Sequence, residues 1–90
     1  MKIKITLSDI LCGKMGDEFG CPIALALKRA HPNKYILVKK DGFFIGDVEY
    51  DTSLKIKEFI ADFDFGFVVH PFEFDTDDLE PDNVNEEVIL

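Results

Sequence analysis

The sequence predicts a single small α+β domain, built on an antiparallel sheet with its helices packed on one face. Three observations lead to this prediction. The chain begins with strictly alternating apolar and polar residues, a Cys-Pro pair opens a helix-like stretch, and an Asp-Gly pair separates two apolar runs. The length of 90 residues allows one domain of this kind and not two.

The first predicted element is a strand over residues 2–7. Apolar and polar side chains alternate there with the period of two that is typical of a strand with one buried face. Ser8 and Asp9 are expected to cap a short helical turn that ends at Cys12. Three glycines then punctuate residues 13–20, which predicts a loop.

Two longer helices are predicted. The first covers residues 21–30, because Pro22 suits the first helical position and cationic side chains fill the last turn. The second begins at Thr52 or Ser53 and carries an apolar stripe at helical spacing. Gly66 is expected to end it.

The remaining strands are predicted from turn signals. Residues 35–40 and 43–50 flank an Asp-Gly pair, which predicts a hairpin closed by a two-residue turn of type I′. Residues 67–74 form the last predicted strand. Pro71 removes one hydrogen-bond donor from it, so this strand is expected at the edge of the sheet or with a bulge.

These elements follow one another as β-α-β-β-α-β, which is the order of ferredoxin-like folds. In that topology the fourth strand lies at an edge, where a proline is tolerated. The predicted core consists of the apolar residues on the inward faces: Ile3, Ile5, Leu7, Ile23, Leu27, Leu37, Val48, Phe59, Phe63, Phe67 and Val69.

The formal charge of −8 is concentrated near the end of the chain. Residues 1–74 hold ten basic and eleven acidic side chains, a net charge of −1, whereas residues 75–90 hold seven acidic and no basic side chains, a net charge of −7. We therefore expect a domain over residues 1–74 and an acidic C-terminal tail over residues 75–90. Such a tail either keeps the protein soluble or binds a partner. The acids of the tail are Asp75, Asp77, Asp78, Glu80, Asp82, Glu86 and Glu87.

Composition excludes several classes of protein. The acidic balance argues against direct binding to nucleic acid or to an anionic membrane. No apolar run reaches the roughly 20 residues that span a bilayer, and lysines interrupt the apolar residues of the N-terminus, unlike a secretory signal. Two cysteines are too few for a disulfide scaffold. These features predict a cytoplasmic protein.

Cys21 is a candidate nucleophile because a thiol at a helix N-terminus has a lowered pKa. It would need a base, and His31 lies at the far end of the same helix, which leaves His70. A capping or buried cysteine is the alternative reading. Together with Cys12 these residues could supply four zinc ligands, but their spacing matches no common zinc site, so no metal is expected.

The loop of residues 13–20 precedes a helix, as phosphate-binding loops do. Asp17 and Glu18 would repel phosphate, and no Gly-Lys-Ser/Thr sequence closes the loop, which excludes a P-loop. A structural loop is the simpler reading. The alternative function from this region is a small-molecule or nucleotide-binding module that uses the loop and the N-terminus of the helix beginning near Cys21.

Three segments carry a resemblance: Gly20-Cys-Pro-Ile-Ala-Leu-Ala-Leu27, Phe63-Asp-Phe-Gly66 and Pro71-Phe-Glu-Phe74. Together they resemble small uncharacterised phage and prophage proteins, in which a Cys-Pro-Ile-Ala-Leu-Ala stretch opens the first long helix and a Pro-Phe-x-Phe segment closes the domain. The resemblance covers about a third of the chain. It implies an accessory phage protein in a bacterial cytoplasm and carries no site residues or cofactor with it.

The sequence therefore favours a non-enzymatic interaction protein that binds a basic surface of a host protein. Its carboxylates are expected to take the place of nucleic-acid phosphates and so to inhibit a host or defence nucleic-acid-binding protein. Small-molecule binding is the alternative, and a thiol enzyme at Cys21 is the third reading. The protein is expected to be a monomer or a homodimer, without a cofactor.

Overall fold

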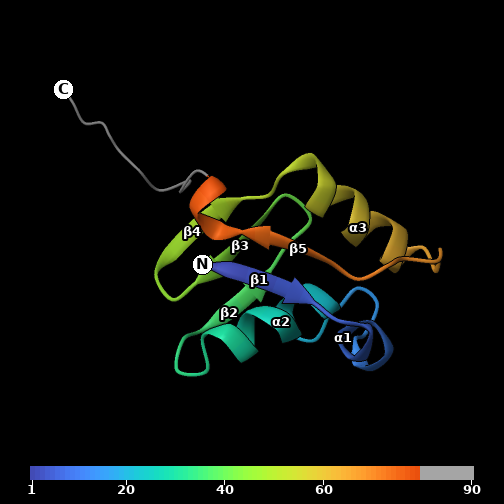
Figure 1. The fold of residues 1–90 in the computed structure, drawn as a ribbon, viewed down its shortest axis with the longest axis horizontal. Coiled ribbons are helices and arrows are strands. Elements are labelled where there is room, and N and C mark those ends of the chain that lie inside the picture. Colours follow the sequence, from blue (N-terminus) through green and yellow to red (C-terminus); the bar gives the residue numbers. More distant parts are fainter. Residues whose placement is uncertain (80–90) are drawn as a thin grey trace.

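The computed structural model of the chain describes residues 1–79, which form a small α+β fold (Figure 1). Within these residues there are two antiparallel sheets and three α-helices. The elements in chain order are β1 (Lys2–Ile5), α1 (Leu7–Cys12), α2 (Pro22–Ala30), β2 (Ile36–Val38), β3 (Gly42–Ile45), β4 (Val48–Asp51), α3 (Leu54–Asp64), β5 (Phe72–Asp75) and the short 3-10 helix η1 (Thr76–Asp78).

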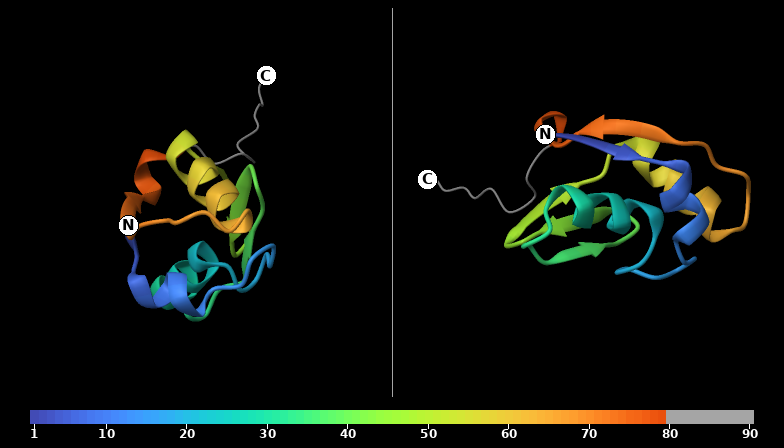
Figure 2. Two further views of the ribbon diagram at one scale, coloured as in Figure 1. Left: turned by 90° about the vertical axis from the view of Figure 1, so that its right-hand side faces the viewer. Right: turned by 60° about the horizontal axis from the view of Figure 1, so that its bottom comes forward.

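The strands form two sheets. β1 pairs with β5 antiparallel, with Ile3 opposite Phe74. β2, β3 and β4 form a separate antiparallel sheet with β3 in the middle. α1 and α2 lie together on one side of the molecule and α3 lies on the other (Figure 2). The α+β class is thus confirmed, whereas the expected ferredoxin-like order of a single sheet, with its helices on one face, is not.

The difference arises largely at Gly46. The segment expected as one strand over residues 43–50 is divided into β3 and β4, since Ile45 pairs with Val48 and leaves two residues between them. Gly46 has a φ of +62°, which is the backbone conformation that the first position of a two-residue II′ turn requires. The predicted I′ turn is wrong, because neither Asp41 nor Gly42 has a positive φ and the β2–β3 connection is longer.

α1 begins earlier than predicted. Thr6 caps it by accepting a hydrogen bond from the backbone N–H of Asp9, and the Asp9 carboxylate accepts one from the N–H of Thr6 in return. Leu7 therefore belongs to the helix and not to the first strand, and its side chain is 58% exposed rather than part of the core. Ser8, the expected cap, lies inside the helix.

Asp9 also joins α1 to α2. Both of its carboxylate oxygens accept hydrogen bonds from Arg29, at 2.7 and 2.8 Å, although the side chain of Asp9 is almost wholly buried. Arg29 donates a further hydrogen bond to the backbone oxygen of Lys4, at 2.7 Å. One guanidinium therefore connects α2 to both β1 and α1.

α1 and α2 approach each other closely at Gly13. A Cβ placed there would lie 2.6 Å from the Cδ of Pro22 and 2.8 Å from the backbone oxygen of Asp9. Neither of these atoms can give way easily, because one belongs to a fixed ring and the other to a helix backbone. Glycine at this position is therefore needed for space.

α2 and α3 begin where the sequence predicts. The Sγ of Cys21 accepts a hydrogen bond from the N–H of Ala24 at 3.5 Å, and Ser53 caps α3 through the N–H of Ile56. β5 is shorter than predicted and begins directly after Pro71, so that residue occupies no position in the ladder.

The core joins the two sheets to the helices. Its buried apolar residues are Ile3, Ile5, Cys21, Ile23, Ala24, Ala26, Leu27, Ile36, Val38, Phe43, Ile45, Ile56, Phe59 and Ile60. Five of the predicted core residues are among them. Leu37, Val48, Phe63 and Val69 are only partly buried, while Leu7 and Phe67 are exposed.

Candidate functional site

Three of the seven acids expected to bind a partner lie within the described residues, at the end of β5. Asp75 is the last residue of that strand, and Asp77 and Asp78 belong to η1. The other four, Glu80, Asp82, Glu86 and Glu87, lie outside the described residues. Figure 1 places η1 beside the N-terminus, at the end of the molecule opposite α1.

Two of these carboxylates have internal partners. The amino group of Met1 lies 2.9 Å from Oδ1 of Asp75 and 3.2 Å from Oδ2 of Asp77. The pKa of Asp75 is lowered, first by the hydrogen bond from the backbone N–H of Asp77 and then by the Met1 amino group. Both contacts therefore favour the ionised form of Asp75.

Thr76 anchors this acidic end to β1. Its backbone N–H donates to the carbonyl oxygen of Met1 at 2.9 Å, its hydroxyl lies 3.2 Å from the same oxygen, and the residue is buried. Regular structure thus continues through Asp78, beyond the boundary after residue 74 used in the charge count. A truncation after residue 74 would remove these contacts. Partner binding by the acidic residues is therefore better tested by substitutions in the full chain.

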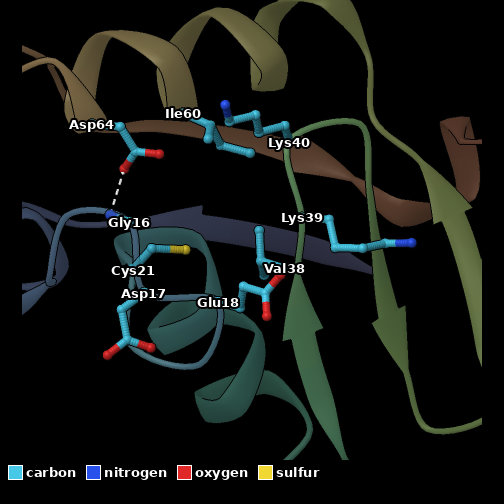
Figure 3. A pocket seen from close by; sticks show the side chains of 9 residues that line it. All are labelled: Gly16, Asp17, Glu18, Cys21, Val38, Lys39, Lys40, Ile60 and Asp64. Carbon is cyan, nitrogen blue, oxygen red and sulfur yellow. Dashed lines mark hydrogen bonds between the residues drawn. The ribbon is translucent and has the colours of Figure 1, made fainter.

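A second candidate site is a cavity beside Cys21, with a volume of about 150 Å³ (Figure 3). It lies between the glycine-rich loop, the β2–β3 connection and α3. It adjoins a larger groove of about 600 Å³, with which it shares Gly16, Lys40, Ile60 and Asp64. The structure therefore brings the loop of residues 13–20 and the start of α2 to one hollow, as the small-molecule alternative expects. α3 completes this hollow.

The Asp64 side chain holds the glycine-rich loop against α3. Its Oδ1 accepts a hydrogen bond from the backbone N–H of Gly16 at 2.9 Å, as Figure 3 shows. Sequence reasoning did not place Asp64 at this site. The two residues lie 48 positions apart, and no local pattern connects them.

Cys21 is poorly suited to act as a nucleophile. Burial raises the pKa of its thiol, and the hydrogen bonds from the N–H groups of Ala24 and Ile23 do not offset this effect. Asp64 and Asp17 raise the pKa further, because their negative charges disfavour a thiolate. The sulfur points into the cavity in Figure 3 but stays in its neutral form near pH 7.

The histidines do not join Cys21 at this cavity, which neither of them lines. His70 lies along a different groove on α3. His31 lies at the C-terminal end of α2, where burial and the charge of Lys34 lower its pKa. Within residues 1–79, no group of three or more His, Cys, Asp and Glu side chains is arranged to hold a metal ion.

Comparison with protein-family models, with curated protein sequences and with solved structures found no match to this chain. The resemblance to small phage and prophage proteins therefore stays a prediction. Among the helices of the described residues, none has the length and apolar character needed to cross a membrane.

Proposed function

We propose that this chain is a non-enzymatic interaction protein of phage type, which binds a basic surface on a protein of its bacterial host. In this proposal it inhibits a host or defence protein that normally binds nucleic acid. The observation that carries the proposal is the charge distribution, since residues 75–90 hold seven carboxylates and no basic side chain. A row of carboxylates presents to a Lys/Arg-lined channel the same negative charge as a phosphate backbone.

The described part of the acidic segment supports this proposal. Asp77 and Asp78 are exposed at one end of the molecule. The side chain of Asp78 has no hydrogen-bond or ion-pair partner within residues 1–79. Hydrogen bonds lower the pKa of Asp75, which favours the charged form of its carboxylate.

The first prediction concerns charge neutralisation in the full chain. We expect the variant with Glu80→Gln, Asp82→Asn, Glu86→Gln and Glu87→Gln to bind its partner at least about tenfold more weakly at low salt, with a shallower dependence of affinity on salt, because fewer charges contribute. The partner is first captured from bacterial lysate on the immobilised protein and identified. Its dissociation constant is then measured by calorimetry at several salt concentrations.

A matched control variant has the same net charge as the variant of the acidic segment. The variant with Glu18→Gln, Asp41→Asn, Asp47→Asn and Asp51→Asn also loses four negative charges, and it leaves the acidic segment and the carboxylates of α3 intact. We expect it to retain most of the affinity, and a duplex DNA fragment to displace the partner from it as from the unmodified chain. Equal weakening by both variants, or no weakening by the first, would contradict the proposal.

A second candidate function is small-molecule binding in the hollow beside Cys21. Its groove of about 600 Å³ lies within the range of roughly 300–1,000 Å³ found for ligand pockets. Lys40 and Lys57 line the groove and have no ion-pair partner within residues 1–79, so they are available to an anionic ligand. The carboxylates of Asp41 and Asp64 also line it and restrict the ligand's anionic group to the lysine side.

The second prediction tests this candidate by thermal unfolding with a panel of nucleotides and aromatic carboxylates. A true ligand at 100 times its dissociation constant stabilises the folded state by about 2.7 kcal/mol, which raises the melting temperature by roughly 10–20 °C in a domain of this size. Ala61→Leu, on the wall of the groove, and Lys57→Gln are expected to remove the shift, whereas Lys34→Gln is expected to retain it. If no compound raises the melting temperature, or if Ala61→Leu leaves the rise unchanged, this candidate fails.

A further inference from the structure

An apolar groove of about 400 Å³ lies between the end of α1 and the segment that follows α3. In Figure 1, the end of α1 and the segment after α3, which form this groove, lie at the end of the molecule opposite η1. Eight residues line it, and none of them is charged or polar: Ile10, Gly13, Met15, Phe63, Gly66, Phe67, Val68 and Val69. In a chain with 31% charged residues, a groove without any charged lining is unusual.

Large apolar side chains stand exposed around this groove. Phe67 is 64% and Val68 83% exposed, while Met15 and, on α1, Leu11 are also mostly accessible. The rings of Phe65 and Phe67 lie 6.3 Å apart and extend the apolar surface toward α3. Contiguous exposed apolar surface of this kind is typical of a site that binds another molecule.

Carboxylates border one side of the groove. Val68 and Val69 continue into a neighbouring depression along α3, which Glu58 and Asp62 also line. Neither of these carboxylates has an ion-pair partner within residues 1–79. The cation beside them, Lys55, lies 5.1 Å from the ring of Phe72. An apolar groove with unpaired carboxylates at its border fits an occupant that is apolar on one face and basic on the other.

We infer that this groove binds a basic amphipathic helix of a protein partner. Apolar side chains at positions i, i+3 or i+4, and i+7 of such a helix would lie against Phe67, Val68 and Met15. Its Lys and Arg side chains would meet Glu58 and Asp62. This inference rests on the proposed function in one respect, because both require a protein partner. The groove contact uses none of the acidic residues of the C-terminal segment.

Charge argues against the other occupants. A second copy of the chain that paired through the same groove would bring its own Glu58 and Asp62 to the same border, and like charges repel at an interface. An anionic membrane surface would repel Glu58 and Asp62 in the same way. A cationic helix satisfies both the apolar lining and the carboxylates.

The experiment uses the full chain and a fluorescent 14-residue peptide of leucine and lysine in helical spacing, with binding followed by anisotropy. Two control peptides have the same composition in scrambled order, or glutamate in place of lysine. We expect binding only to the first peptide. Phe67→Ser with Val68→Ser should weaken it about tenfold or more, and Glu58→Gln with Asp62→Asn about threefold or more.

Matched variants identify the surface. Leu54→Ser with Tyr35→Ser removes two exposed apolar side chains outside the groove. Asp41→Asn with Asp51→Asn removes two carboxylates outside it. Both double variants are expected to bind the peptide as the unmodified chain does. The serine substitutions replace exposed residues, and circular dichroism verifies the fold. Equal binding of the scrambled peptide, or unchanged binding by the Phe67/Val68 variant, would overturn the inference.

Two further results separate this inference from the proposed function. If neutralising Glu80, Asp82, Glu86 and Glu87 abolishes peptide binding while the groove variant does not affect it, the peptide binds the acidic segment and the groove inference is wrong. If the unmodified chain forms a dimer by sedimentation and Phe67→Ser with Val68→Ser makes it monomeric, the groove is a self-interface and the inference is equally wrong. Peptide binding that depends on the groove, with no role for the acidic segment, would support this inference alone.

Discussion

Replacing Arg29 by methionine is expected to lower the free energy of unfolding by about 3 kcal/mol, measured by urea denaturation at pH 7. The substitution leaves the carboxylate of Asp9 with a negative charge, only 4% exposed and without its cation. Removing one partner of a buried ion pair typically costs about 3–5 kcal/mol. We expect the lower end of that range, because the Arg29 side chain is itself half exposed and water can partly replace it.

Two variants test the reason for this loss. Lys34→Met removes a cation from an exposed surface position and is expected to change the free energy of unfolding by less than about 0.5 kcal/mol. The double variant Asp9→Asn with Arg29→Met should be less destabilised than the sum of its single variants, because the uncompensated charge is gone. A loss below about 1 kcal/mol for Arg29→Met would contradict this account of the ion pair.

The same ion pair has a defined pH dependence. Burial alone would raise the pKa of Asp9, but the hydrogen bonds from Arg29 and Thr6 outweigh burial and leave the pKa below its ordinary value of 3.8. The stabilisation is therefore complete above pH 3.8 and is lost as the pH falls through the lower pKa of the folded state. The difference in unfolding free energy between the unmodified chain and Asp9→Asn should shrink below about pH 4. A difference that stays constant down to pH 2 would exclude this origin.

Replacing Phe43 by alanine is expected to cost about 3–5 kcal/mol of unfolding free energy. Phe43 is fully buried on the central strand β3, where its ring lies 5.5 Å from that of Tyr50 and 6.0 Å from that of Phe74 on β5. The ring thus packs between the two sheets, and its loss leaves a cavity where they meet. A domain of this size has a total stability of roughly 5–13 kcal/mol, so the variant should be largely unfolded in moderate urea.

The control for this prediction is Phe65→Ala. It removes the same side chain from a position that is 79% exposed and is expected to change stability by less than about 0.5 kcal/mol. Both variants are compared by urea denaturation with fluorescence and circular dichroism. Similar midpoints for the two variants would mean that Phe43 does not hold the sheets together.

Local signals in the sequence predicted the two long helices correctly. The Cys21-Pro22 pair and Ser53 are caps, which act through hydrogen bonds within a few residues, so their effect is visible in a short stretch of sequence. The first strand and α1 were harder to separate. Thr6 and Ser8 are both good caps, and the choice between them depends on Asp9 meeting Arg29, twenty positions away.

The arrangement of strands depends on information that a local pattern does not contain. Apolar and polar residues continue to alternate across Gly46, which favours one unbroken strand. The only local sign of the turn is the pair Gly46-Asp47, and Asp41-Gly42 nearby is the stronger turn signal. Phe43 was missed as a core residue because its burial depends on β5 packing against β3. The apolar character of Phe67 predicts a core position, but its exposure depends on how the segment before Pro71 passes α1.

The candidate sites also differ in whether the sequence alone predicts them. The acids of residues 75–90 could be identified by counting, since charge is a property of composition. The hollow beside Cys21 depends on the hydrogen bond between Gly16 and Asp64, and the apolar groove depends on α1 lying near the end of α3. Such long-range pairs have no signal in a single sequence.

The pairing of β1 with β5 has a consequence for synthesis on the ribosome. Met1 and Thr76, which are bonded at the end of this ladder, are 75 positions apart, so β1 emerges roughly 4–15 s before its partner strand at bacterial and eukaryotic elongation rates. During that interval Ile3 and Ile5 lack the strand that pairs with them. Nascent chains of this protein are therefore expected to bind a ribosome-associated chaperone until β5 is released, whereas the β2–β3–β4 meander can form as soon as it emerges.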